Sequence, residues 1–185
     1  EICVFLLRKG FLVKALNYCF DILARKAENI LLIKVLEDAN ALNETYINEM
    51  ENIAGFIGGK PIIVAEKSGE KLKDNIIYSR FNVNTLNFIT FKNAINNKAL
   101  FVRSKRAGLA VEIDSGKLKE IADDEGISLS SLARKIGVSV QMIKRYEDGK
   151  AEVSIEKAAK FYDVFGNKIF KAIQIFKKSN VESNA

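Results

Sequence analysis

The most regular pattern of hydrophobic and polar positions lies in residues 128–147, where it predicts two short amphipathic helices. The positions expected to face inward are Leu132, Ala133 and Ile136 in the first helix and Ile143 and Tyr146 in the second. Ser128 and Ser139 stand where a serine caps a helix N-terminus by accepting backbone N–H bonds. Gly137 falls between the helices, where a tight turn favours a residue without Cβ.

The second helix, expected over residues 140–148, leaves a largely polar surface exposed. The side chains on that surface are Val140, Gln141, Met142, Lys144 and Arg145. Glutamine and arginine can each make two hydrogen bonds to a base edge, while lysine and arginine hold phosphates. A helix-turn-helix presents such a surface to the major groove of DNA. A plain helical hairpin with a solvated polar face has the same spacing, so this pattern alone leaves both interpretations open.

Three further helices are predicted around this pair: residues 117–125, a helix that Ser154 caps, and a last one at about 167–176. The inward positions of the Ser154 helix are expected to be Ile155, Ala158, Ala159, Tyr162 and Val164. This order resembles the phage-repressor (Cro-type, XRE) DNA-binding domain over residues 117–173. The residues that carry the resemblance are Leu132, Ala133, Gly137, Val138, Ser139, Ile143, Tyr146, Glu147, Asp148 and Gly149. It implies an all-α domain of five helices over residues 114–176.

Residues 1–113 alternate helical and strand patterns, as expected of a mixed α/β domain. The apolar run 30–36 predicts a central strand that is covered on both faces. Residues 61–65 predict a second buried strand. A helix that Asn43 opens and that Gly58 and Gly59 end connects the two strands, so they are expected to be parallel. The remaining predicted elements are helices at 2–7 and 87–95, strands near 11–16, 18–25 and 76–78, and a hairpin of 100–102 with 109–113.

The order of these elements, with Asp21 on one strand and Lys34 on the next, resembles the PD-(D/E)XK nuclease fold, a restriction-endonuclease-like mixed sheet with flanking helices. In that family an aspartate and an acid-X-lysine triplet hold Mg²⁺ beside the lysine. The middle acid would fall at Leu32, which cannot bind a metal. We therefore expect Asp21 and Lys34 to form a structural pair in an inactive domain over residues 1–97. An active, Mg²⁺-dependent nuclease is the alternative.

Composition narrows the chemistry that the chain can perform. The 185 residues include no histidine, which excludes Ser-His-Asp and Cys-His nucleophiles and His-ligated zinc. Cys3 and Cys19 lie in apolar contexts and are expected to be free thiols in a reducing cytosol. No apolar run is long enough to cross a bilayer, and nothing resembles a signal peptide. A cytoplasmic protein without a membrane partner is therefore expected.

The formal net charge of +6 favours a nucleic-acid partner without proving one. Residues 1–113 carry +4 and residues 114–185 carry +2, so the helical part is not strongly basic overall. The DNA-binding hypothesis depends instead on where its basic side chains stand. Residues 98–113 are predicted to be a basic β connector, more typical of a solvated edge strand than of a DNA contact. Residues 177–185 are predicted to be a polar tail.

Taken whole, the chain resembles an archaeal family of HTH-type transcriptional regulators, in which a nuclease-like domain precedes a Cro-type helix-turn-helix. The match is most specific at residues 20–25, 31–36 and 128–149. It implies sequence-specific binding of double-stranded DNA. The side chains expected to contact DNA are Ser128, Arg134, Lys135, Ser139, Val140, Gln141, Met142, Lys144 and Arg145.

One such domain buries little DNA surface, so we expect a homodimer, through the fifth helix or through the α/β domain. We expect no cofactor and no metal, and the sequence leaves open whether a small-molecule effector exists. A protein-binding antitoxin or restriction-system controller is a further alternative to a transcriptional regulator.

Overall fold

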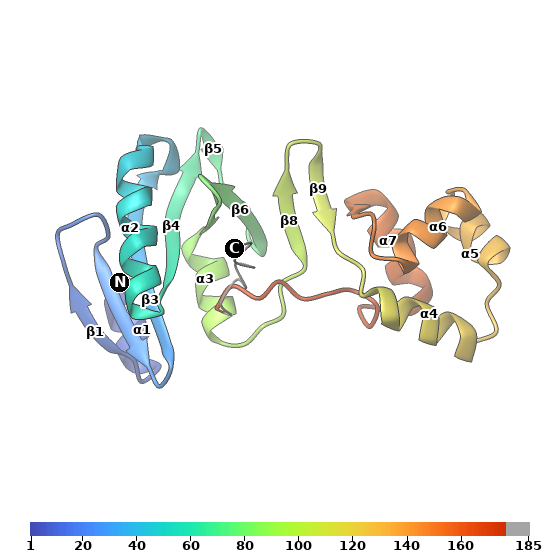
Figure 1. The fold of residues 1–185 in the computed structure, drawn as a ribbon, viewed down its shortest axis with the longest axis horizontal. Coiled ribbons are helices and arrows are strands. Elements are labelled where there is room, and N and C mark those ends of the chain that lie inside the picture. The colour runs from blue at the N-terminus through green and yellow to red at the C-terminus, as the bar shows by residue number, and fades with distance from the viewer. Residues whose placement is uncertain (177–185) are drawn as a thin grey trace. The chain divides into compact units, whose positions relative to one another are not determined.

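The computed structural model describes residues 1–176, which form two compact units (Figure 1). Among the described residues, the first unit is Glu1–Ala99 together with residues 174–176, and the second is Leu100–Ile173. The predicted polar tail, residues 177–185, lies outside the described residues. No described helix is long and apolar enough to cross a membrane.

The first unit is built on a mixed sheet with the strand order β1-β2-β3-β4-β7-β6. Its strands are β1 (Leu12–Ala15), β2 (Ile22–Lys26), β3 (Asn29–Asp38), β4 (Lys60–Ser68), β6 (Ile76–Arg80) and β7 (Val83–Leu86), with the short β5 (Glu70–Lys71) beside β4. The central strand β4 is parallel to both of its neighbours, β3 and β7, while the other neighbouring strands are antiparallel. The predicted parallel pairing of residues 30–36 with 61–65 is therefore confirmed.

Helices cover both faces of this sheet. On one face lies α2 (Glu44–Ile57), where Met50 and Ala54 pack against Leu32 of β3. On the other face lie α1 (Ile2–Arg8) and α3 (Phe88–Ile95), which meet through Phe5 and Phe88, with 6.1 Å between the ring centroids. The caps of α2 are those predicted, because the Asn43 side chain accepts a bond from the Tyr46 N–H and the helix ends at a left-handed Gly58. A short 3₁₀ helix, η1 (Ala39–Ala41), links β3 to α2.

The expectation that β3 is covered on both faces holds for only part of the strand. Leu31, Leu32 and Ile33 are buried. Val35, two residues further on, is 39% exposed although β2 and β4 flank the strand. This opening in the α1/α3 face of the sheet is one side of a cavity described below.

The second unit joins a small antiparallel sheet to four helices. Its strands are β8 (Val102–Lys105), β9 (Gly108–Val111) and β10 (Val153–Ser154), and its helices are α4 (Ser115–Asp124), α5 (Leu129–Ile136), α6 (Val140–Glu147) and α7 (Ile155–Phe165). The predicted hairpin is thus present, and β10 pairs with it within the same unit. Ser154 caps α7 by accepting a bond from the Lys157 N–H, as predicted.

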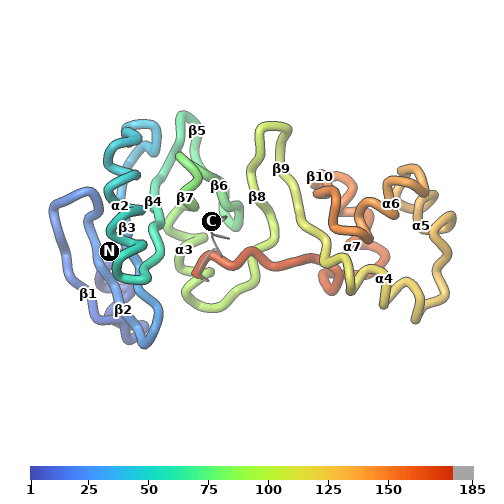
Figure 2. Tube along the Cα trace, in the orientation of Figure 1, coloured from blue at the N-terminus to red at the C-terminus, as the bar shows by residue number. Residues whose placement is uncertain are grey.

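The predicted fifth helix at residues 167–176 is wrong. Residues 167–169 form a turn, Phe170 makes a β-bridge to Ile113, and the chain then runs extended beside the hairpin (Figure 2). The Lys171 N–H donates to the Glu112 carbonyl, and the Ile173 N–H donates to the Leu100 carbonyl. These two hydrogen bonds, to residues that flank the hairpin, take the place of the helical hydrogen bonds that the apolar spacing predicts.

The inward side of α7 also differs from the prediction. Ala158, Phe161 and Phe165 are buried, whereas Tyr162 is 58% exposed. The three buried residues follow i, i+3 and i+7 spacing. The buried face is rotated from the predicted one, because Phe161 and Phe165 fill the core of this unit in place of Ile155 and Tyr162.

Candidate nucleic-acid interface

Helices α5 and α6 form the helix pair that the sequence predicts. The Ser128 hydroxyl accepts a bond from the Ser131 N–H at 3.2 Å, and the Ser139 hydroxyl accepts one from the Met142 N–H at 3.1 Å. Gly137 ends α5 in the left-handed conformation, with φ +75°. Side chains with a Cβ rarely adopt this conformation, so glycine allows the chain to reverse within two residues.

The apolar faces of both helices are anchored in one core. The predicted inward side chains are all buried: Leu132, Ala133, Ile136, Ile143 and Tyr146. The Tyr146 ring packs edge-on against Phe161 of α7, with 5.7 Å between centroids. Burial raises the pKa of the Tyr146 hydroxyl, which keeps the side chain neutral. Because α6 is held from behind by α7, its opposite face is the one left to solvent.

That opposite face carries four of the nine side chains predicted to contact DNA. Gln141, Lys144 and Arg145 are exposed, and Val140 is partly so. Met142 differs from the prediction, because its side chain is half-buried and packs against the core.

Four basic side chains stand on the exposed surface of α5 and α6: Arg134, Lys135, Lys144 and Arg145. Within residues 1–176 no ion pair engages any of them. Cations that are not already neutralised by neighbouring carboxylates are available to phosphates.

Two lysines of α7 lie at the turn between α5 and α6, and sequence reasoning missed both. The Lys157 ammonium donates to the Gly137 carbonyl at 2.9 Å. A Cβ placed on Gly137 would lie 3.2 Å from the Lys160 ammonium. Twenty residues separate Lys157 from Gly137, so only the packing of α7 on the helix pair reveals the contact.

One acidic side chain sits at the end of α6. Glu147 is half-buried, and burial is the largest of the influences that raise the pKa of its carboxyl, with Asp123 adding to it. The neighbouring Asp148 pairs with Lys150 at 3.0 Å. Two acidic side chains, Glu147 and Asp148, thus follow the basic Lys144 and Arg145 at the C-terminal end of α6.

The nuclease-like residues of the first unit are held in a compact structural arrangement. The Lys34 ammonium lies 3.0 Å from Asp21 Oδ1, and the Val35 N–H donates to Asp21 Oδ2 at 2.7 Å. Both carboxylate oxygens thus accept bonds that tie the start of β2 to β3. Leu32 is fully buried under α2, and within residues 1–176 no three potential ligand side chains are grouped to hold a metal.

The two cysteines are free thiols, as expected. Cys19 is buried beside Phe20 and Leu32, and burial raises the pKa of its thiol. Cys3 is half-buried on α1.

Comparisons with known proteins divide the chain in the same place. Residues 1–100 match the PD-(D/E)XK superfamily domain, and residues 118–170 match a helix-turn-helix family. Three archaeal proteins are similar over most of the chain, and each is named provisionally as an HTH-type transcriptional regulatory protein.

The protein from Methanosarcina barkeri is 36% identical over 160 residues, which is 85% of this chain and 49% of that protein. The Methanococcoides burtonii protein is 31% identical over 183 residues, which is 95% of this chain and 56% of that protein. The Methanocaldococcus jannaschii protein is 30% identical over 178 residues, which is 94% of this chain and 56% of that protein. The chain spans about half the length of these relatives.

Proposed function

Since the chain belongs to the PD-(D/E)XK superfamily through residues 1–100 and carries a helix-turn-helix after it, we propose that it is a sequence-specific, double-stranded-DNA-binding transcriptional regulator of the cytoplasm. The observation that supports this most is the face of α6, where Gln141, Lys144 and Arg145 are exposed and make no ion pair within residues 1–176. The names of the archaeal relatives point the same way.

In the proposed complex α6 enters the major groove and reads bases. Gln141 prefers adenine and Arg145 prefers guanine, because each of these pairs makes two hydrogen bonds. Val140 contacts a thymine methyl, and Lys144 holds a phosphate or a base. Met142 contributes less than the sequence indicated, because its side chain packs against the core.

Other contacts, to DNA phosphates, fix the register of the protein on the duplex. Arg134 and Lys135, exposed in the last turn of α5, bind phosphates. The first turns of α5 and α6, which Ser128 and Ser139 cap, present backbone N–H groups to phosphates as well.

Selection of bound sites from random duplex DNA, at one stated salt concentration, tests this assignment. We expect a defined motif, and we expect Arg145→Ala to lose about 1–3 kcal/mol and to relax preference at one base position. The matched control is Lys135→Ala, which should weaken all sequences alike and reduce the salt slope by about one unit. If Arg145→Ala keeps the motif unchanged and merely weakens binding, Arg145 is a phosphate contact and the proposed reader is wrong.

We propose further that the nuclease-like unit does not cleave DNA. Two observations support this: both oxygens of the Asp21 carboxylate are engaged by Lys34 and Val35, and the buried Leu32 stands where the resemblance would require an acid. The selected duplexes incubated with the protein and Mg²⁺ should therefore stay intact. Cleavage that Asp21→Ala abolishes would contradict this proposal.

We also propose that the regulator binds as a homodimer on a near-palindromic site, because a single helix-turn-helix covers one half-site. The fifth helix offered by the sequence as one dimer surface is not formed in residues 167–176. The α/β unit is therefore the better candidate for the contact between the two copies.

A further inference from the structure

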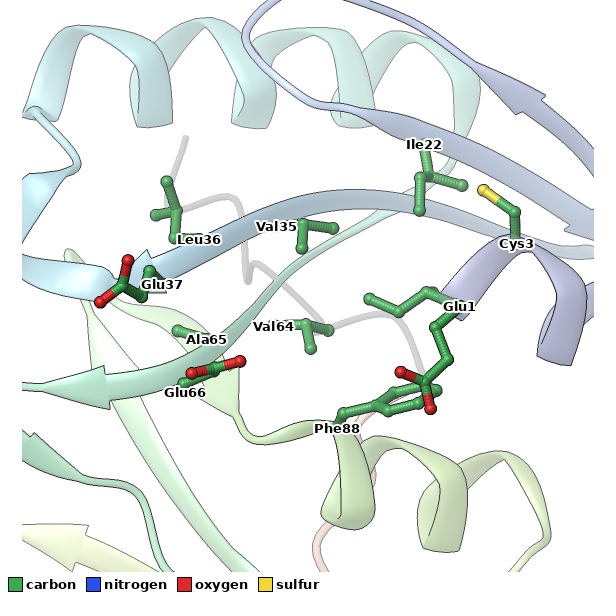
Figure 3. A pocket seen from close by; sticks show the side chains of 11 residues that line it. Glu1, Cys3, Ile22, Val35, Leu36, Glu37, Val64, Ala65, Glu66 and Phe88 are labelled. Carbon is green, nitrogen blue, oxygen red and sulfur yellow. The ribbon is translucent and has the colours of Figure 1, made fainter.

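The first unit contains a cavity of about 600 Å³ that the DNA-binding proposal does not use (Figure 3). Its floor is the face of the sheet formed by β2, β3 and β4, and its walls are the first residues of α1 and Phe88 at the start of α3. Side chains alternate along a strand, so Val35 points to the face opposite Leu32 and Lys34. The cavity is therefore separate from the Asp21–Lys34 pair.

The centre of the cavity is apolar. Val35 and Val64 are paired across the parallel strands β3 and β4, and Ile22 of β2 lies beside them. Val35 is 39% exposed although it stands in the middle of the sheet. A ligand that covers exposed apolar surface at such a position is stabilised by removing that surface from water.

The rim of the cavity is acidic. Glu37 and Glu66 lie at one end and Glu1 lies beside Phe88 at the other, with Val35 and Val64 between them (Figure 3). Among residues 1–176, no lysine or arginine lines the cavity. Glu37 is paired with Lys67 at 2.9 Å, whereas Glu1 and Glu66 make no ion pair within residues 1–176. The charge of the rim thus complements a cation in a chain whose net charge is +6.

The size and lining suit an organic cation better than a metal ion. Binding cavities for small molecules span roughly 300–1,000 Å³ and combine apolar walls with a few polar groups. A metal ion needs several oxygen ligands at short distance, and within residues 1–176 no such group is present.

We propose that this cavity binds an arylalkylamine, that is, a flat apolar body joined to one ammonium group. The ammonium lies against the Glu66 carboxylate, and the apolar body lies on the exposed Val35 beside the Phe88 ring. This binding involves the α/β unit alone, so it stands or falls separately from DNA recognition by α6.

Calorimetric titration of the complete chain with three indoles tests the proposal. Tryptamine carries the ammonium, N-acetyltryptamine is its neutral analogue, and indole-3-propionate is an anionic one. We expect one equivalent of tryptamine to bind, the neutral analogue to bind at least fivefold more weakly, and the acid not to bind. Equal binding of all three would show an unselective apolar surface, and no binding of tryptamine would reject the proposed ligand class; either result overturns the proposal.

Substitutions then locate the binding. Glu66→Gln should weaken tryptamine binding at least fivefold, while the matched control Glu51→Gln, on the exposed side of α2, should leave it unchanged. Val35→Phe fills the cavity from a position that is already partly exposed, and it should abolish binding without unfolding the chain, which circular dichroism checks. Binding that both variants retain would place the ligand elsewhere and reject the site.

Cys3 supplies a reporter that needs no substitution. It lines the cavity, whereas Cys19 is buried. Tryptamine should therefore slow the reaction of Cys3 with N-ethylmaleimide, and N-acetyltryptamine at the same concentration should slow it less. An unchanged rate under saturating tryptamine would also contradict binding at this cavity.

Discussion

Glu147 is the only acidic residue of α6, and it stands in a helix whose exposed face is otherwise basic or neutral. Burial raises the pKa of its carboxyl, because the charged form loses water that no bonded partner replaces. Lys119 and Lys144 oppose this shift without cancelling it. The protein therefore carries a charge at this position at a cost to its own stability.

Replacement of Glu147 by glutamine should stabilise the protein at neutral pH. The pKa is raised on folding, so wild type loses stability as the pH rises from the ordinary carboxyl value, 4.5, through the higher value in the folded state. Glutamine does not ionise, so the variant should have a higher free energy of unfolding than wild type at pH 7. This difference should vanish near pH 4. Urea denaturation at both pH values measures it.

The control for this prediction is Glu120→Gln, which removes an exposed negative charge from α4. If that variant gains as much stability at pH 7 as Glu147→Gln does, the effect comes from net charge and not from burial of the Glu147 carboxyl.

Single residues also show which features the sequence encodes locally. The four caps at Asn43, Ser128, Ser139 and Ser154 were predictable, because each bond joins a side chain to a backbone N–H three residues later. Burial of one side chain depends on distant partners, so the half-buried Met142 was not predictable.

At the scale of elements, α7 supports the helix pair from behind through both packing and charge. Phe161 anchors Tyr146, and Lys157 bonds the carbonyl of the turn residue Gly137. That carbonyl lies at the C-terminal end of α5, where the helix dipole favours a positive charge. Lys157 thus ties α7 to the turn between α5 and α6.

Lys157→Met should test this support, because methionine keeps the apolar stem and removes the donor. We expect a loss of about 1 kcal/mol in the free energy of unfolding, the usual contribution of one hydrogen bond. We also expect weaker binding to all DNA sequences alike, since no base contact changes. The control Lys160→Met keeps the bond to Gly137 and should retain wild-type stability. Equal stability of Lys157→Met and wild type would show that packing alone sets the turn.

Elements with a strong local pattern were predictable, and those that depend on pairing were not. The helix from Asn43 and the strand at 61–65 combine caps, glycine stops and long apolar runs. β7 was missed because its residues Asn84 and Thr85 interrupt the apolar pattern, although Thr85 is buried and its hydroxyl donates to the Val83 carbonyl. The last segment has apolar residues at near-helical spacing, but the β-bridge of Phe170 to Ile113 makes it extended.

At the scale of the molecule, the surface proposed to read DNA and the surface proposed to join two copies belong to different units. The helix-turn-helix lies wholly within Leu100–Ile173, and the α/β unit has its own sheet and core. We expect two chains on a selected duplex with two half-sites about one helical turn apart, measured by analytical ultracentrifugation.

A duplex with one half-site provides the control for that experiment and should bind one chain more weakly. A single chain on the two-half-site duplex, with no second chain added at higher protein concentration, would contradict the dimer. The cavity was not predictable from the sequence, because residues from several separated strands and helices form it.

The packing around Leu32 restricts the side chains that position 32 can hold. Gly59 leaves no room for a side chain, because a Cβ there would stand 2.4 Å from the Leu32 methyl, and Met50 and Ala54 close the space on the helix side. An acid introduced at position 32 would enter this closed space without water, where a charged carboxylate is strongly disfavoured. The neighbours of position 32 thus favour an apolar side chain of about the size of leucine.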